Sequence, residues 1–392
     1  MMGERIGIEV SQAIAEAAML SNVDVVAAYP ITPQTHIVEH LAELVANGEL
    51  DAEYIPVESE HSAMSACLGA VATGARTFTA TAGQGLELMH EVLYVASSMR
   101  LPVIMSVANR ALSGPLNVWG DQSDLMSVRD TGWIQIVAAN GQEAVDNIIC
   151  AFAIGEDRRV LLPVMVHVDG FYLTHVIEPI IMPSQEEVDQ FLPPYDYPLP
   201  LDTERPVTMG AFAPPVLYPE AKKAQDVNLR GAMPVILEHW DRFEKEFGRK
   251  YGPLEHYRSE GAKTLLLTMG SIGDTASAAV DKMRDEGKDV GLVQLRLWRP
   301  FPFAEFRNAV RDADLLVVVD RAISFGGPGG PFCSEVRAAL YDEEKRPKVT
   351  GFIAGLGGRD ITVAGFEEMV ARGMEIAETG AEQEYEIYGV RE

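Results

Sequence analysis

Cysteine is scarce in this sequence: Cys67, Cys150 and Cys333 are the only three in 392 residues, and they form no C-x-x-C pair. Zinc sites and iron–sulfur clusters need several thiolates brought together. The chain therefore cannot build such a site from its own cysteines. Cys67 and Cys150 fall in apolar helical patterns, which is typical of buried thiols.

Basic residues and long apolar runs are also few. Lysine and arginine number 32 against 58 acidic residues, so the formal charge is −26 and a nucleic acid backbone would be repelled. The acidic surface serves either solubility or a basic protein partner. No window reaches the roughly 18 apolar residues that a membrane span needs, and the N-terminus has no signal-peptide pattern. We expect a cytoplasmic protein that binds neither nucleic acid nor membrane.

The common nucleotide-binding fingerprints are missing. There is no G-x-G-x-x-G after a strand and no G-x-x-x-x-G-K-[ST]. The glycine cluster GGPGG at 326–330 contains a proline where a phosphate loop needs an amide donor. Dinucleotide-dependent and ATP-dependent enzymes are thereby disfavoured.

The first half of the chain contains a regular alternation of apolar runs and helical patterns. Between about Ser11 and Asp169, segments of helical period separate the runs VDVVAAYP, EYIPV, RTFTATA, LPVIMSVAN, WIQIVAA and VLLPVMVHV. Such alternation predicts an α/β fold, a doubly wound parallel sheet with helices on both faces. We place this first domain at residues 1–178.

The prolines divide the rest of the chain. Ten of the 23 fall in residues 179–219, which predicts an extended arm outside any central sheet. The arm region, 179–260, also contains a helix that must dock on a domain or on a partner. Its apolar stripe consists of Ile236, Trp240, Phe243 and Phe247. Four further strand–helix units predict a smaller α/β domain at 261–380, and residues 381–392 are expected to form an acidic tail.

Polar side chains follow several strands of the first domain, at the edge where open α/β sheets bind ligands. In YPITP the prolines fix the backbone and leave the Thr32 hydroxyl projecting, to contact a small polar ligand or to cap the next helix. Glu60 opens a helix of small residues, which leaves room for a planar ring beside its carboxylate. A plain surface carboxylate at a helix N-terminus is the alternative.

Two further segments have the same position after a strand. In TAGQGL, a pair of glycines, one of them Gly85, flanks Gln84, which suits either close approach of the backbone to a ligand or a plain tight turn. Arg110 stands beyond LPVIMSVAN and can grip a carboxylate with two parallel hydrogen bonds. Its alternative partners are Asp121 and Asp124, in an internal salt bridge.

Together, YPITP, VESEHSA, TAGQGL and NRALSGPLNVWGDQSD resemble, in this order and spacing, the pyrimidine-binding domain of pyruvate:ferredoxin oxidoreductases and their alpha subunits. The later stretch GSIGDTASAAVDKMRDEGKDVGLVQLRLWRPFP is similar to the next domain of the same proteins, which is like the C-terminal domain of transketolase. The resemblance covers nearly the whole chain. It implies a thiamine-diphosphate-binding fold and the alpha subunit of a 2-oxoacid:ferredoxin oxidoreductase.

Carried over onto matching positions, the resemblance implies a role for each site residue. Glu60 would be the catalytic acid at N1′ of the thiamine aminopyrimidine, with Gln84 and Gly85 beside the cofactor. Thr32 and Arg110 would contact the 2-oxoacid, the arginine at its carboxylate. The acidic residues of GDQSD are implied to lie near the site, with no step assigned to them.

The resemblance also implies what other chains supply. Enzymes of this kind hold Mg²⁺ and the diphosphate of the cofactor with a G-D-G motif, and this sequence has none. Thiamine diphosphate would therefore be shared with a beta subunit that brings the Mg²⁺ half-site and an iron–sulfur cluster, while this chain binds no metal. Gamma and delta subunits, ferredoxin and coenzyme A complete the implied partners, in a complex expected to be dimerised.

The expected reaction is oxidative decarboxylation of pyruvate with coenzyme A to acetyl-CoA, CO₂ and reduced ferredoxin. Thr32 and Arg110 suit one carboxylate and a small neutral tail, and oxalate, 2-oxoisovalerate and 2-oxoglutarate stay open as substrates. Two alternatives from other classes are a non-catalytic scaffold subunit and a self-sufficient decarboxylase.

Overall fold

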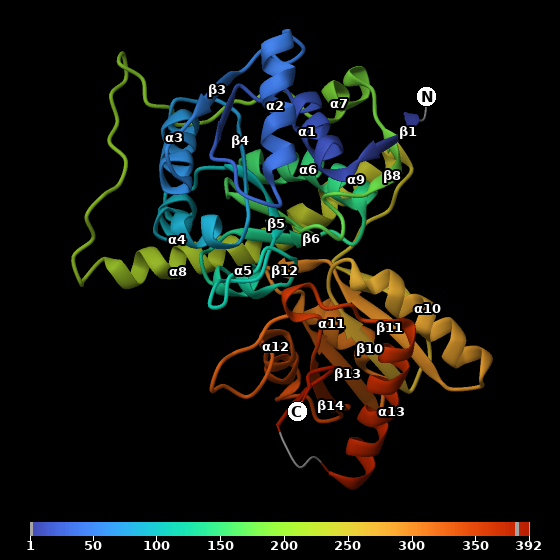
Figure 1. Cartoon of the computed structure of the whole chain (residues 1–392). Coiled ribbons are helices and arrows are strands. Elements are labelled where there is room, and N and C mark those ends of the chain that lie inside the picture. The colour runs from blue at the N-terminus through green and yellow to red at the C-terminus, as the bar shows by residue number, and fades with distance from the viewer. Residues whose placement is uncertain (1–2, 381–383, 392) are drawn as a thin grey trace.

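The computed structural model of the chain describes residues 3–380 and 384–391. Two α/β bodies are stacked in Figure 1, the first mainly blue to green and the second orange to red. The first contains a seven-stranded sheet in the order β12-β6-β7-β5-β4-β2-β3. Its strands are β2 (Val25–Ala28), β3 (Glu53–Pro56), β4 (Thr77–Thr81), β5 (Ile104–Asn109), β6 (Ile134–Val137), β7 (Val164–Asp169) and β12 (Leu297–Arg299). All neighbours are parallel except β12 and β6, which confirms the predicted sheet.

Helices cover both faces of this sheet. One apolar core contains residues of α1 (Val10–Leu20), α2 (Thr35–Asn47) and α6 (Gly141–Glu156). A second core, on the other face, contains residues of α3 (Glu60–Ala72) and α4 (Gly83–Ser98). Strands β5 and β7 are buried along their whole length because each of their faces meets a helix layer. This explains why their sequences do not alternate between apolar and polar residues.

The arm region packs on the first domain at its start and again over residues 233–247, whereas residues 254–257 near its end join the second sheet. Its elements are β8 (Ile177–Met182), α7 (Gln185–Phe191), α8 (Tyr218–Gly231) and α9 (Met233–Phe247). Strand β8 pairs with β1 (Glu4–Glu9) outside the central sheet, and the boundary after residue 178, which stays a prediction, falls inside β8. Helix α9 buries Ile236, Trp240 and Phe243 in the core beside α6, so the predicted docking on a domain is confirmed. Between α7 and α8 the chain extends away from the body, at the left of Figure 1.

The second domain has the four predicted strand–helix units. They are β10 (Thr264–Thr268) with α10 (Ile272–Asp285), β11 (Val290–Leu295) with α11 (Phe303–Val310), β13 (Leu315–Asp320) with α12 (Pro331–Leu340), and β14 (Lys348–Ile353) with α13 (Val363–Thr379). Strand β9 (Leu254–Tyr257) adds an antiparallel edge beside β11. The turn η1 (Leu356–Gly358) follows β14.

The expected acidic tail is only partly a tail. Residues 381–383 and 392 lie outside the described residues, but β15 (Glu386–Ile387) pairs with β14 at the edge of the second sheet. Tyr388 packs against the core of that domain and donates a hydrogen bond to Glu368. The glutamate-rich composition of the last residues gave no sign that Ile387 and Tyr388 would join the second domain.

The two domains are joined by more than the covalent connection. Strand β12, predicted as part of the second domain, completes the edge of the first sheet, and Leu297 is buried in the first domain's core. A buried ion pair links Asp169 at the end of β7 with Arg321 after β13. Within the described part of the chain, no helix is both long enough and apolar enough to cross a lipid bilayer.

Candidate active site at the strand ends

Glu60 lies where β3 passes into α3. Ser59 caps the helix by accepting the backbone N–H of Ser62 at 3.2 Å, which fixes Glu60 as its first residue. Its side chain is only 6% exposed, yet among the described residues no group forms a hydrogen bond or ion pair with its carboxylate. Since buried carboxylates are normally paired, this one is available to a ligand.

The turn between β4 and α4 lies against Glu60. A Cβ atom at Gly85 would stand 2.6 Å from Oε1 of Glu60 and 2.5 Å from Oγ1 of Thr81, so only glycine fits here. The Thr81 hydroxyl and Oε1 of Gln84 are both buried, and neither has a hydrogen-bond partner among the described residues. The Glu60 carboxylate, the Thr81 hydroxyl and Oε1 of Gln84 are thus three polar groups around the end of β4 that lack a hydrogen-bond partner among the described residues.

Arg110 follows β5 and is held by two backbone carbonyl groups. Its Nε donates to the carbonyl oxygen of Asn117 at 2.9 Å and Nη1 donates to that of Thr32 at 3.0 Å. Burial lowers the pKa of Arg110, while the negative charges of Asp124 and Glu60 oppose that change. Among the described residues no carboxylate forms an ion pair with the guanidinium, so Nη2 keeps its N–H groups for another acceptor.

The salt bridge considered from the sequence, between Arg110 and either Asp121 or Asp124, does not form. Asp124 instead accepts the backbone N–H groups of Gly83 and Arg110, both at 2.9 Å, through one oxygen. Its other oxygen accepts the side-chain amide of Asn109 at 2.8 Å. Complete burial raises the pKa of Asp124 to about 7, despite these hydrogen bonds. Asp124 therefore fixes the ends of β4 and β5 relative to each other.

Thr32 contributes its carbonyl group to the site, and its side chain is exposed. It does not cap α2, whose N-cap is Gln34 without a side-chain hydrogen bond. The alternative of a helix-capping threonine is therefore wrong. Gln34 instead donates a hydrogen bond to the carbonyl of Ala80 at 2.6 Å, which ties this loop to β4.

Several residues of the site were missed in the sequence. Thr81 contributes a buried hydroxyl, and Asn117 contributes a backbone carbonyl that accepts from Arg110. No sequence pattern indicates either contribution. Asp124 was noticed, but most of its partners are backbone N–H groups, which every sequence has.

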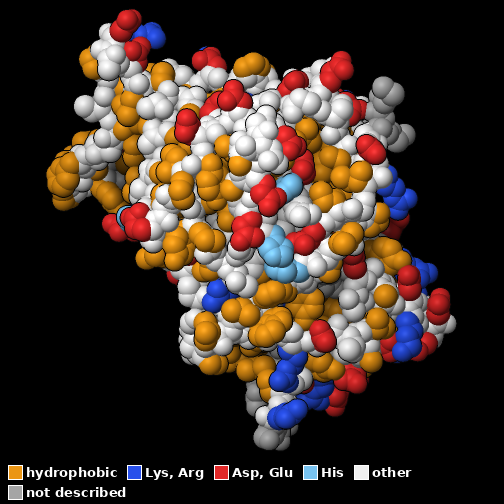
Figure 2. Space-filling view, turned by 45° about the horizontal axis from the view of Figure 1, so that its top comes forward, with side chains coloured by type: hydrophobic (Ala, Val, Ile, Leu, Met, Phe, Trp, Pro, Cys, Tyr) orange, Lys and Arg blue, Asp and Glu red, His pale blue; other side chains and the backbone are white. Residues whose placement is uncertain are grey.

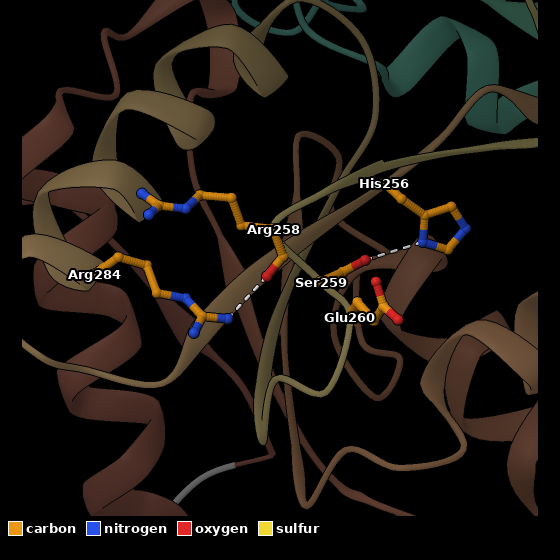
Figure 3. Close-up of a pocket in the computed structure, with 5 residues that line it drawn as sticks. All are labelled: His256, Arg258, Ser259, Glu260 and Arg284. Carbon is orange, nitrogen blue, oxygen red and sulfur yellow. Dashed lines mark hydrogen bonds between the residues drawn. The ribbon is translucent and has the colours of Figure 1, made fainter.

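A hollow of about 460 Å³ lies elsewhere, in the second domain, and Figure 3 shows its lining. The side chains around it are those of His256, Arg258, Ser259, Glu260 and Arg284. Both arginines are already neutralised, Arg258 by Asp281 at 2.7 Å and Arg284 by Asp289 at 3.0 Å. Arg284 also donates to the carbonyl of Arg258, as the dashed line in Figure 3 marks. This hollow thus offers an anion no free charge.

The surface around the strand ends is partly apolar. Tyr29, Leu116 and Trp119 are 37%, 76% and 53% exposed, and they belong to the loops that carry Thr32 and Arg110. On the face in Figure 2, hydrophobic patches are interrupted mainly by acidic side chains, with histidines near the centre. Within residues 3–380 and 384–391, no group of three or more His, Cys, Asp or Glu side chains could hold a metal ion.

Comparison with known proteins gives the class. Over 96% of this chain and 66% of the other, the fold matches a solved 2-oxoglutarate:ferredoxin oxidoreductase from Magnetococcus marinus, with a TM-score of 0.69 and 21% identity. A pyruvate synthase subunit PorA of Methanothermobacter thermautotrophicus is 50% identical over 93% of this chain and 94% of its own length. A PorA of Pyrococcus abyssi is 48% identical over 95% and 94%. A ketoisovalerate oxidoreductase subunit VorA of Pyrococcus horikoshii is 44% identical over 97% and 96%.

The fold and these relatives define an oxidoreductase subunit with an α/β domain of the thiamine-diphosphate-binding type. Residues 16–233 match the family "pyruvate flavodoxin/ferredoxin oxidoreductase, thiamine diphosphate-binding", and residues 262–366 match core domain II of pyruvate:ferredoxin oxidoreductase. The chain belongs to the pyruvate flavodoxin/ferredoxin oxidoreductase family, which confirms the resemblance seen in its motifs.

Proposed function

We propose that this chain is the alpha subunit of a pyruvate:ferredoxin oxidoreductase and that Glu60, Gln84 and Gly85 hold the aminopyrimidine half of thiamine diphosphate. The single observation that carries the proposal is the nearly buried carboxylate of Glu60, with which no other described residue forms a hydrogen bond or ion pair. Beside it, Gly85 makes room for the Glu60 carboxylate, since a Cβ atom there would stand 2.6 Å from Oε1 of Glu60, and Oε1 of Gln84 has no hydrogen-bond partner among the described residues. These residues fit a flat heterocycle with nitrogen atoms on its edge.

The bound cofactor supplies an electron sink for decarboxylation. Glu60 holds a proton at N1′ of the pyrimidine, which is general acid–base work for which a carboxyl group within hydrogen-bond reach is suited. Arg110 binds the carboxylate of the 2-oxoacid through its Nη2 edge, because the carbonyls of Asn117 and Thr32 already occupy Nε and Nη1. The Thr32 hydroxyl contacts the substrate from the open side.

Pyruvate leads among the substrates. The two PorA relatives, named for pyruvate synthase, are more similar to this chain than the ketoisovalerate relative is. One arginine suits a single carboxylate, whereas oxalate or 2-oxoglutarate would need a second cation. 2-Oxoisovalerate would need more apolar room.

The remaining parts of the enzyme come from partner chains. A beta subunit brings Mg²⁺, the diphosphate half-site and an iron–sulfur cluster, and it covers the apolar rim formed by Tyr29, Leu116 and Trp119. Gamma and delta subunits pass the electrons to ferredoxin, coenzyme A takes the acyl group, and the complex dimerises.

The test replaces Glu60 in a complex reconstituted from this chain and its partners. Glu60→Gln keeps the size of the side chain but removes the carboxyl proton, so turnover of pyruvate should fall by roughly 10²-fold or more. The affinity for thiamine diphosphate, measured by calorimetry, should fall as well. Glu58→Gln is the matched control, since Glu58 is exposed and accepts a hydrogen bond from the Ser62 hydroxyl.

Two outcomes would contradict the proposal. Undiminished oxidation of 2-oxoacid by the Glu60→Gln complex would favour a scaffold subunit. Turnover by the purified chain alone, with Mg²⁺ and thiamine diphosphate, would favour a self-sufficient decarboxylase.

A further inference from the structure

Arg110 depends on a loop that the second domain holds. The loop runs from Ala111 to Trp119, and its two ends are joined by the hydrogen bond from the Ala111 N–H to the Trp119 carbonyl at 3.0 Å. Its middle is irregular and mostly exposed, without a helix or strand. Within the loop, Oδ1 of Asn117 accepts the N–H of Trp119 at 2.7 Å, but this bond ties Asn117 only to its own loop and not to a helix or strand.

The turn η1 of the second domain supplies that fixation. The side chain of Asn117 donates from Nδ2 to the carbonyl oxygen of Gly357 at 3.0 Å. Asp121, two residues beyond the loop, accepts the N–H of the same glycine at 2.9 Å. Both backbone groups of Gly357 are therefore bonded to the segment that follows Arg110. The loop leads into α5 (Ser123–Ser127), on the side of the first domain that faces the second in Figure 1.

Gly357 is the residue type that this contact requires. Its φ of +57° lies in the left-handed region, where residues with a Cβ atom are strained. A Cβ atom would also collide with Nδ2 of Asn117. The neighbouring Gly358 similarly leaves no room between itself and Trp119, and its carbonyl accepts the Tyr172 hydroxyl at 2.6 Å.

We propose that the second domain sets the position of the substrate-binding arginine, through a clamp in which Gly357 holds Asn117 and Asn117 holds Nε of Arg110. Asn117 and Gly357 are positioning residues, since neither touches the reacting atoms. The inference rests on the proposed role of Arg110 as the site of the 2-oxoacid carboxylate. Through this clamp the second domain would raise the affinity of the enzyme for its substrate, although it does not touch the substrate itself.

The experiment compares variants in the reconstituted complex, by the KM for pyruvate, the KM for coenzyme A and kcat. Asn117→Ala removes the hydrogen bond to Gly357 together with the bond that Asn117 accepts from the Trp119 N–H, whereas Gly357→Ala displaces Asn117 and leaves its side chain in place to bond Trp119. Either change should raise the KM for pyruvate by about tenfold, which corresponds to about 1.4 kcal/mol, and leave the KM for coenzyme A unchanged. The double variant should be no worse than the more affected single variant, because both changes break one contact.

Gly287→Ala is the matched control. Gly287 lies in the same domain at a φ of +82°, but a Cβ atom there meets no atom within 4 Å, so it brings strain without the contact. Its kinetics should equal those of the wild type. If Gly287→Ala raised the KM as much as Gly357→Ala, general strain of the domain would explain the effect and the clamp would be rejected.

Arg110→Ala separates the two levels of the proposal. If Arg110→Ala leaves the KM for pyruvate unchanged, the proposed function of Arg110 fails, and the clamp fails with it. If Arg110→Ala raises that KM while Asn117→Ala and Gly357→Ala do not, only the clamp is overturned. Asn117→Ala adds no strain, so it tests the clamp even where the glycine variant folds poorly.

Discussion

Asp169 at the end of β7 and Arg321 after β13 form an ion pair whose two side chains are almost fully buried. Asp169 also accepts the backbone N–H of Ser271 at 2.7 Å, and Arg321 donates to the carbonyl of Gly120 at 2.8 Å. Both charges are thus removed from water at the seam between the domains. Removing one member of such a pair leaves the other charge buried without a counter-charge. That change lowers the stability of the fold more than replacing both members by apolar residues does.

Removing one member of this pair should destabilise the chain. Arg321→Met leaves Asp169 buried without a counter-charge, and we expect the free energy of unfolding to fall by about 3–5 kcal/mol. The double variant Asp169→Asn with Arg321→Met should recover a large part of that loss. Urea denaturation measures both. Arg230→Met, in the exposed pair with Asp226, should change the value by less than about 1 kcal/mol.

Gly85→Ala should reduce cofactor binding, and the close contacts of its Cβ atom should also lower the free energy of unfolding by about 1–3 kcal/mol. Alanine favours a helix over glycine by about 1 kcal/mol, but its Cβ atom would push aside the Glu60 carboxylate and the Thr81 hydroxyl. We expect the affinity for thiamine diphosphate to fall by about tenfold or more. Gly69→Ala, in α3 with open space around it, should leave that affinity at the wild-type value. Equal affinities for the two variants would contradict the assigned cofactor position.

His167 should make the chain sensitive to acid. Burial lowers the pKa of His167 from 6.5 to about 3, so folding holds the ring neutral. Because the folded pKa is depressed, the stability it contributes is complete above pH 6.5 and is lost as the pH falls toward 3. His167→Gln should flatten the decline of the free energy of unfolding between pH 6 and 4 by about 1 kcal/mol per pH unit.

Asp124→Ala should both destabilise the chain and weaken substrate binding. The N–H groups of Gly83 and Arg110 would lose their acceptor, at a cost of about 3 kcal/mol or more. Since folding raises the pKa of Asp124 from 3.8 to about 7, the stabilising effect of this residue is largest below pH 3.8 and declines as the pH rises through 7. The difference between wild type and variant should therefore be smaller at pH 8 than at pH 5. A difference that stays constant between pH 5 and pH 8 would mean that the carboxylate is ionised throughout that range.

Strand ends could be read from the sequence, and contacts between distant segments could not. Glu60 and Arg110 were predictable because each follows an apolar strand, and parallel strands bring such residues to one edge. The contact between Asn117 and Gly357 joins residues 240 positions apart, through a backbone carbonyl that carries no sequence signal. The sequence also did not show that β12 belongs to the first sheet. Its few residues directly follow β11, a strand of the second sheet, yet they pair with β6 of the first.

That shared strand has a consequence for how the protein is made. While the first domain emerges from the ribosome, β12 has not yet been synthesised, and the outer edge of β6 presents unpaired backbone groups. Such an edge readily pairs with another nascent chain, so a product cut short before Leu297 should aggregate although it contains almost the whole of the first domain. The first sheet is completed only when β12 has left the ribosome and pairs with β6.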